Sequence, residues 1–141
     1  MTSQPPPRRK ILFVCVGNTC RSQMAEGFAR HYGKDVVDVR SAGTNAMSTV
    51  NGGTIEAMKE IGIDISKHAA KQLTYEMMGW ADVVVTLGGL PASSLCPASY
   101  AGGKLDWNIA DPLGRPPEVM RTVRDDIGRR VRELIDEQER Q

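Results

Sequence analysis

The sequence predicts a single-domain α/β protein in which a four-stranded parallel sheet is flanked by helices on both faces. Short apolar runs rich in β-branched residues alternate with segments whose apolar residues recur every three or four positions, and this is the order of elements in βαβ units. The strand segments are almost continuously apolar, which is typical of strands buried on both faces. A chain of 141 residues without internal repeats is long enough for one such core.

Four segments have the pattern of strands, three of them strong and the last one weaker. They are "KILFVCV" (10–16), "DVVDVRSAGT" (35–44), "ADVVVTLGG" (81–89) and "KLDWNIADP" (104–112). Parallel strands joined by right-handed crossovers place their ligand crevice at the carboxyl ends of the strands. We therefore expect a functional site at the turn that follows the first strand.

Helical periodicity follows the first, second and fourth strands. Met24, Phe28 and Tyr32 recur every four residues, which indicates a helix. This helix is expected to end near Gly33 and the next one near Gly62, because glycine favours helix C-termini. The second stripe and the closing stripe consist of Ile55, Met58 and Ile61, and of Met120, Val123, Ile127, Val131 and Leu134.

Composition and charge exclude several classes of function. Residues 1–10 lack periodicity and are expected to form a flexible N-terminal tail, which leaves 11–141 as the domain. The net charge is +1 and the 18 lysines and arginines form no stripe, so no nucleic-acid partner is expected. Without a transmembrane or secretory apolar run, we expect no membrane partner and a cytoplasmic location. An odd number of cysteines argues against a disulfide framework.

The turn after the first strand carries Cys15 and Arg21, separated by five residues. Gly17 permits unusual backbone dihedrals, and Asn18 tolerates left-handed geometry. Such a loop can turn its N–H groups inward, next to the positive end of a helix that begins near Ser22. The loop is therefore predicted to bind an oxyanion, with the guanidinium supplying two parallel donors. The predicted oxyanion-binding residues are Val16, Gly17, Asn18, Thr19, Cys20 and Arg21.

Cys15 lies at the mouth of this positive cup, which stabilises the thiolate and favours a nucleophilic role. Ser22 is placed to donate its hydroxyl to that thiolate. A cysteine at the end of a buried strand is by itself more often core filling, and Cys20 is expected to be a packed thiol. The spacing of Cys15 with the glycine, asparagine, arginine and serine favours the catalytic interpretation. No metal site is predicted, because His31 and His68 lack the spacing of metal ligands.

The run "VCVGNTCRSQMAEG" (14–27) resembles the signature of the low-molecular-weight protein tyrosine phosphatase superfamily. The resemblance continues through "SAGT", "IEAMKEIGIDISKH", "ADVVVTL" and "DWNIADP" to the final helix, and covers nearly the whole chain after residue 10. It implies the low-molecular-weight phosphatase fold. Within the superfamily, "RSQMAEG" resembles the arsenate reductase branch. Thr19 and "DPLG" are closer to that branch, or to bacterial protein-arginine phosphatases, than to the tyrosine phosphatases.

This resemblance implies that Cys15 attacks the oxyanion and that Asp111 is the general acid that protonates the leaving oxygen. It implies an arsenate reductase, in which a second thiol attacks the sulfur of the Cys15 adduct and releases arsenite. A phosphatase side activity is expected. The alternative function is a phosphatase of protein phosphotyrosine or phosphoarginine, with a phosphoprotein as its partner. A catalytically silent module that binds oxyanions is disfavoured, since nucleophile, arginine, serine and acid are all present.

The source of the second thiol remains open in the sequence. Thioredoxin-coupled relatives carry two cysteines after the third strand; Gly88 and Gly89 occupy the first position here, and Cys96 matches the second. Cys96 lies in segment 90–103, whose proline, serine and glycine content predicts a loop. Either Cys96 resolves the adduct across a flexible loop, or an external thioredoxin, glutaredoxin or small thiol does, or the protein no longer reduces anything. The competing interpretation of Cys96 itself is a solvent-exposed loop thiol without a role. No tightly bound cofactor is expected.

One further position departs from the pattern of the resemblance. Several arsenate reductases hold a potassium ion beside the loop with an asparagine, a glutamate, a serine and an aspartate. Asn18, Glu26 and Ser41 match the first three, but Lys71 lies near the place of the aspartate. We expect the Lys71 ammonium to replace the ion.

Overall fold

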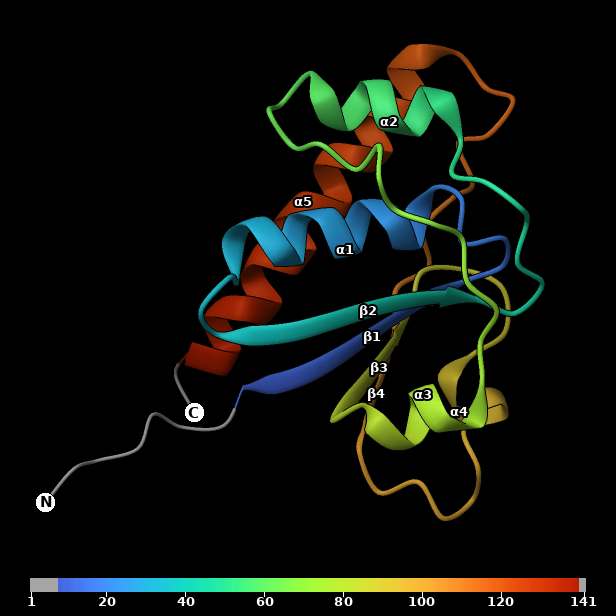
Figure 1. Cartoon of the computed structure of the whole chain (residues 1–141), viewed down its shortest axis with the longest axis vertical. Helices are drawn as coiled ribbons and strands as arrows, with labels where there is room; N and C mark the ends of the chain where they lie inside the picture. Colours follow the sequence, from blue (N-terminus) through green and yellow to red (C-terminus); the bar gives the residue numbers. More distant parts are fainter. Residues whose placement is uncertain (1–7, 140–141) are drawn as a thin grey trace, which may run out of the picture.

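The computed structural model describes residues 8–139. In these residues a parallel sheet has the strand order β2-β1-β3-β4, which confirms the predicted fold class (Figure 1). The strands are β1 (Arg9–Cys15), β2 (Val37–Gly43), β3 (Val83–Thr86) and β4 (Gly103–Asp106). The helices are α1 (Arg21–Tyr32), α2 (Gly52–Lys59), α3 (Tyr75–Trp80), α4 (Ala92–Leu95) and α5 (Pro117–Glu139).

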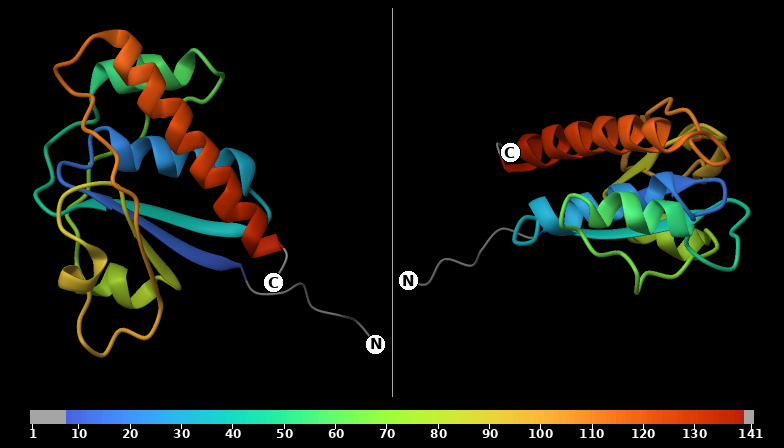
Figure 2. Two further views of the ribbon diagram at one scale, coloured as in Figure 1. Left: turned by 180° about the vertical axis from the view of Figure 1, so that it is seen from behind. Right: turned by 90° about the horizontal axis from the view of Figure 1, so that it is seen from above.

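Two hydrophobic clusters cover the two faces of the sheet. Alternate residues of β1 point to opposite faces, so Phe13 and Cys15 belong to one cluster and Leu12 and Val14 to the other. Helices α1, α2 and α5 pack on the first face, while α3 and α4 cover the second (Figure 2). The loops after the strands therefore gather at one end of the sheet, and Cys15 lies at that end.

Several boundaries differ from the predicted ones. Strand β1 begins at Arg9, which pairs with Val37 of β2, so the last residues of the expected tail belong to the sheet; residues 1–7 lie outside the described residues. Helix α3 was not predicted, because six residues are too few to display a helical period. Its N-terminus is capped by Thr74, whose side chain accepts from the Met77 N–H at 3.2 Å. The expected loop 90–103 contains the single turn of α4.

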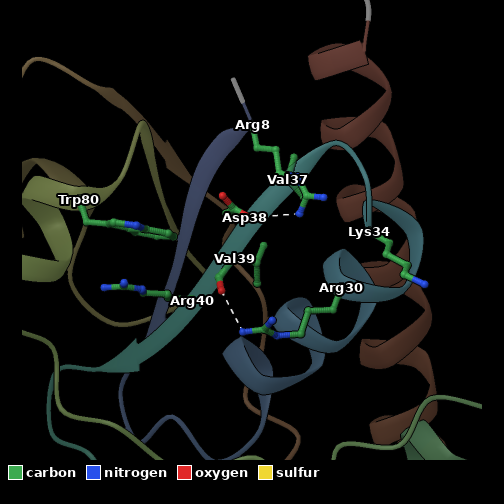
Figure 3. Close-up of a pocket in the computed structure, with 8 residues that line it drawn as sticks. All are labelled: Arg8, Arg30, Lys34, Val37, Asp38, Val39, Arg40 and Trp80. Carbon is green, nitrogen blue, oxygen red and sulfur yellow. Dashed lines mark hydrogen bonds and ion pairs between the residues drawn. The ribbon is translucent and has the colours of Figure 1, made fainter. Parts of the chain in front are cut away.

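Charged side chains protect the outer edge of β2, where unpaired backbone groups would otherwise invite another strand. Arg8 pairs with Asp38 at 3.3 Å, and Arg30 Nη2 donates to the Val39 carbonyl at 3.0 Å. Arg40 stacks on Trp80, 4.3 Å from the ring centroid. Together these residues line a cavity of about 370 Å³ (Figure 3). None of the predicted catalytic or oxyanion-binding residues lines this cavity.

A search of the described helices for a membrane span found none that is both long and apolar enough to cross a bilayer.

Candidate active site

The loop between β1 and α1, residues 16–20, is held in place by hydrogen bonds that its carbonyl groups accept from other segments. Backbone N–H groups from other segments donate to these carbonyls and to that of Cys15. The pairs, donor first, are Thr44 and Cys15 (3.0 Å), Asn45 and Val16 (2.9 Å), Met47 and Gly17 (3.0 Å), Asn51 and Thr19 (3.0 Å), and Met24 and Cys20 (2.9 Å). Gln23 Nε2 donates to the Asn18 carbonyl at 3.1 Å. In the described part of the chain, no N–H group of residues 16–21 donates to a protein atom. The loop therefore offers consecutive N–H groups to an anion.

Helix α1 adds its N-terminus to this cup. Its N-cap residue Cys20 makes no side-chain capping bond, and its first turn contains no acidic residue. The first N–H groups of a helix lack internal partners, and the helix dipole makes this end positive. Loop and helix end together form a site for a tetrahedral oxyanion.

The Cys15 thiol lies at the base of the cup and is 3 % exposed. Its Sγ is 2.8 Å from Ser22 Oγ. Because Asn18 Nδ2 donates to the same Oγ at 2.7 Å, that oxygen already accepts one hydrogen bond and its own proton can point to the sulfur. The serine hydroxyl is thus oriented to stabilise a Cys15 thiolate, as the sequence analysis predicts.

Asn18 organises the loop through both ends of its side chain. Its backbone has φ 55°, a left-handed conformation that asparagine adopts more easily than most residues. Its Oδ1 accepts from the Lys71 N–H at 2.8 Å and from Gln23 Nε2 at 3.1 Å. Its Nδ2 also donates to Ser41 Oγ at 3.0 Å. The loop is therefore fastened to β2, to α1 and to the segment before α3.

A buried carboxylate supports this network. Ser41 Oγ donates to Glu26 Oε1 at 2.6 Å, and Arg30 Nε donates to Oε2 at 3.0 Å. Lys71 Nζ lies 3.8 Å from Oε1 and His68 Nδ1 lies 3.5 Å from Oε2. Burial by itself raises the pKa of Glu26, but the Ser41 hydrogen bond and the nearby cations lower it below its ordinary value. Glu26 is therefore ionised, and protein cations surround its charge.

Because Lys71 already lies beside Glu26, we predict that potassium raises the Tm of the protein no more than sodium does at equal ionic strength. The Lys71 side chain is 36 % exposed, so Lys71→Gln should lower the free energy of unfolding by only about 0.2–1 kcal/mol. Thermal unfolding in matched chloride salts measures both effects. A Tm that rises with potassium and not with sodium would show that an ion still binds here.

The guanidinium of Arg21 lies between the ends of two other strands. Its Nη1 donates to the carbonyls of Leu87 at 3.2 Å and Ile109 at 2.8 Å. Its Nη2 lies 3.9 Å from Asp111 Oδ2. The side chain is 10 % exposed, so the protein fixes the direction of the remaining donors.

Gly88 provides the space in which this guanidinium lies. Its φ is 142°, and a Cβ at this position would overlap with Nη1 of Arg21. Any side chain at residue 88 would therefore displace the arginine and also strain the backbone.

Gly88→Ala is predicted to lower kcat/KM for an aryl phosphate by about 100-fold, the size expected when a catalytic group moves by about 1 Å. Gly62→Ala is the matched control, since Gly62 has φ 82° but nothing within 4 Å of an added Cβ. Both variants should lose about 1–2 kcal/mol of stability through backbone strain. Equal activity in the two variants would show that Gly88 does not position Arg21.

Asp111 lies at the open side of the cup, with a side chain that is 53 % exposed. Its Oδ1 accepts from the Leu113 N–H at 3.0 Å, which fixes the carboxyl orientation. The other oxygen, Oδ2, is the one that faces Arg21. This geometry leaves Oδ2 available to carry and deliver a proton.

The other two cysteines lie away from the open cup. Cys20 is buried, its Sγ is 3.6 Å from Met120 Sδ, and burial raises the pKa of its thiol to about 11. Cys96 is 8 % exposed and belongs to the hydrophobic cluster on the other face of the sheet from Cys15. Burial also raises the pKa of Cys96. The interpretation of Cys96 as a solvent-exposed loop thiol, one of those that the sequence left open, is thus wrong, because its side chain packs in the cluster between α4 and the sheet.

Sequence reasoning missed several residues that build the site. Gly43 ends β2 so close to the loop that a Cβ would lie 2.5 Å from the Val16 carbonyl oxygen. His68 Nδ1 lies 2.9 Å from Gln23 Oε1. These contacts join segments that lie far apart in the chain, so no local sequence pattern predicts them. Among the described residues, no group of three or more histidine, cysteine or acidic side chains could hold a metal ion.

The family model for low molecular weight phosphotyrosine protein phosphatases matches residues 10–141. The chain belongs to this family. Among curated relatives, the arsenate reductase of Halalkalibacterium halodurans is 44 % identical over 132 residues, which cover 89 % of this chain and 94 % of the relative.

Two solved members of the family have similar structures. The YwlE arginine phosphatase from Geobacillus stearothermophilus is 30 % identical with a TM-score of 0.82, over 93 % of each chain. A thioredoxin-dependent arsenate reductase from Corynebacterium glutamicum is 31 % identical with a TM-score of 0.80, over 94 % of this chain and 63 % of that one. Family members of this fold thus include both a reductase and a phosphatase.

Proposed function

We propose that this protein reduces arsenate to arsenite through a covalent adduct on Cys15. The observation that carries the proposal is the Cys15 thiol, 2.8 Å from a serine hydroxyl and at the base of a cup of free N–H groups. A trigonal or tetrahedral oxyanion bound there has its central atom in front of the sulfur. The similarity to arsenate reductases supports arsenate as the substrate.

In the first step, the Cys15 thiolate attacks arsenic and one arsenate oxygen leaves. Arg21 and the loop N–H groups stabilise the negative charge on the remaining oxygens. The departing oxygen is that of an arsenate hydroxyl, and Asp111 gives it the one further proton with which it leaves as water. Ser22 holds the thiolate before the attack. None of these steps requires a bound cofactor.

In the second step, a thiol from outside the chain resolves the adduct. Cys96 would have to leave the hydrophobic cluster on the opposite face of the sheet to reach Cys15. The Cys20 thiol, whose pKa burial raises to about 11, stays protonated at neutral pH. An external thioredoxin, glutaredoxin or small thiol is therefore the better donor, and a cytoplasmic location supplies the reducing conditions it needs.

The second candidate function is a protein phosphatase that acts on phosphoarginine or phosphotyrosine. The similarity to an arginine phosphatase favours it, and the first step would be the same, with phosphorus in place of arsenic. The two functions differ in what removes the group from Cys15, because a phosphatase uses water and a reductase uses a thiol.

Arsenite release from arsenate tests the proposal, measured with reduced thioredoxin, with glutaredoxin and glutathione, and with dithiothreitol. Hydrolysis of p-nitrophenyl phosphate is measured in parallel. We expect arsenite release with at least one donor, and an equal rate for Cys96→Ser, since the second thiol is external. Loss of arsenite release in Cys96→Ser would establish an internal relay. Hydrolysis without arsenite release under any donor would assign the protein to the phosphatases.

A further inference from the structure

Four exposed apolar side chains belong to the loops at the end of the sheet that carries the cup, and we call them the apolar rim. They are Val16 (41 % exposed), Met47 (61 %), Leu90 (55 %) and Leu113 (37 %). Each comes from a different loop, following β1, β2, β3 and β4 respectively. These four loops lie at the same end of the parallel sheet, the end at which β1 leads into the oxyanion loop (Figure 1).

Contacts tie each member of the rim to the cup. The Met47 N–H donates to the Gly17 carbonyl at 3.0 Å. Gly89, which precedes Leu90, packs so close to Val16 that an added Cβ would lie 2.9 Å from Val16 Cγ2. The Leu113 N–H donates to Asp111 Oδ1 at 3.0 Å. These contacts place the rim residues beside the oxyanion loop and the acid.

Binding of arsenate does not explain why apolar side chains are exposed here. Arsenate is a small, hydrated anion that is bound by N–H groups and a guanidinium, and apolar side chains add nothing to its binding. Grouped exposed apolar residues instead mark contact with another macromolecule. The other large exposed apolar residues of residues 8–139 lie apart from this site; they are Tyr32, Ile61, Tyr75 and Leu105.

We propose that the apolar rim is the docking surface for a protein dithiol that resolves the Cys15 adduct. This inference rests on the proposed arsenate reductase function. The rim lies beside the place where the second thiol must arrive, so whatever delivers that thiol covers these side chains. A protein with an apolar surface around its thiol gains from burying them, whereas a small charged thiol does not.

The chemistry requires two thiols for each arsenate. The first partner thiolate attacks Cys15 Sγ, a disulfide bond forms, and the electron pair of the sulfur–arsenic bond stays on arsenic, which leaves as arsenite. The second partner thiolate then attacks the partner's sulfur in the mixed disulfide and releases the Cys15 thiolate. Two thiols are oxidised to one disulfide while As(V) becomes As(III), so the electrons balance. A dithiol partner completes the cycle without a second cysteine from this chain.

The test compares a protein dithiol with a small one on the same variants. Leu90→Ser and Leu90→Ala alter an exposed side chain whose residue makes no hydrogen bond to the oxyanion loop. For arsenite release driven by reduced thioredoxin, each should lower kcat/KM about 10-fold, since an interface anchor is worth roughly 1–2 kcal/mol. Release driven by dithiothreitol, p-nitrophenyl phosphate hydrolysis and Tm should match the wild type. Tyr75→Ser is the control, because Tyr75 is 77 % exposed but lies on α3.

The possible results distinguish failure of the docking surface from failure of the proposed reductase function. A selective loss with thioredoxin supports the docking surface. Unchanged thioredoxin-driven release in both rim variants overturns it while the reductase function stands, and so does an equal loss with dithiothreitol. Wild-type protein that releases no arsenite with either donor overturns the proposed function, and the docking surface with it.

Discussion

Cys15→Ser is expected to lower kcat for p-nitrophenyl phosphate by a factor on the order of 10⁵ to 10⁶, the size seen when the nucleophile of a catalytic unit is removed. Arsenite release should fall below detection, because serine oxygen cannot form the sulfur–arsenic bond or the later disulfide. Phosphate binding should survive, since the N–H groups of the loop and Arg21 remain. Loss of the thiolate also removes a negative charge beside the anion, so the affinity for phosphate should equal or exceed that of the wild type.

Steady-state kinetics and calorimetric titration with phosphate measure these two properties of Cys15→Ser. Cys96→Ser is the matched control for aryl phosphate hydrolysis, because it makes the same exchange of sulfur for oxygen in a side chain on the other face of the sheet. Residual hydrolysis close to the wild-type rate in Cys15→Ser would show that another group is the nucleophile. Loss of phosphate binding would show that the substitution disturbs the loop itself.

The fold could be predicted because strands β1 and β3 are buried on both faces. Such strands give continuous apolar runs, as in residues 10–16 and 81–89, and these stand out without any partner information. Helix α3 gave no such signal, because its six residues owe their conformation to the Thr74 cap and to packing on the sheet. Strand β4 is short and solvent-exposed along its length, so no continuous apolar run marks its end. The predicted strand 104–112 therefore extended beyond the observed end at Asp106.

From the pattern of residues alone, the candidate site was predictable as far as it is contiguous in the chain, whereas Asp111, Ser41 and Lys71 were associated with it by the family resemblance. Nucleophile, oxyanion loop and thiolate donor all lie between Cys15 and Ser22, where spacing alone implies proximity. The supports of the loop come from residues 41–51 and 68–72, and the surroundings of Arg21 come from residues 87–88 and 109. Those contacts are set by the order of strands in the sheet, which a single sequence expresses only indirectly.

Cys96 illustrates a different limit. Its segment has the composition of a loop, so an exposed thiol was one of the interpretations that the sequence left open for Cys96. In the structure, one turn of helix at α4 anchors the segment, and the Cys96 N–H donates to the Ala92 carbonyl at 2.9 Å. The composition of a segment predicts that it forms a loop, but it does not predict whether that loop packs against the hydrophobic core.

Arg21→Lys is expected to lower kcat/KM for p-nitrophenyl phosphate by about 10³-fold, a loss of the size seen when an oxyanion donor is removed. Lysine keeps the positive charge but lacks the planar fork. It cannot donate to the Leu87 and Ile109 carbonyls and to two oxygens of the anion at once. Phosphate affinity should therefore fall together with kcat, in contrast to Cys15→Ser, and calorimetric titration with phosphate separates the two variants.

The same substitution should also destabilise the fold. The guanidinium satisfies two carbonyls at the ends of different strands, and leaving a buried carbonyl without a donor costs about 1–3 kcal/mol. Urea unfolding measures this loss, and Arg121→Lys is the control, because Arg121 pairs with Glu60 on the surface. If Arg21→Lys kept wild-type phosphate affinity and stability, charge alone would explain the role of the arginine. Its fixed position against Gly88 would then have no part in binding the oxyanion.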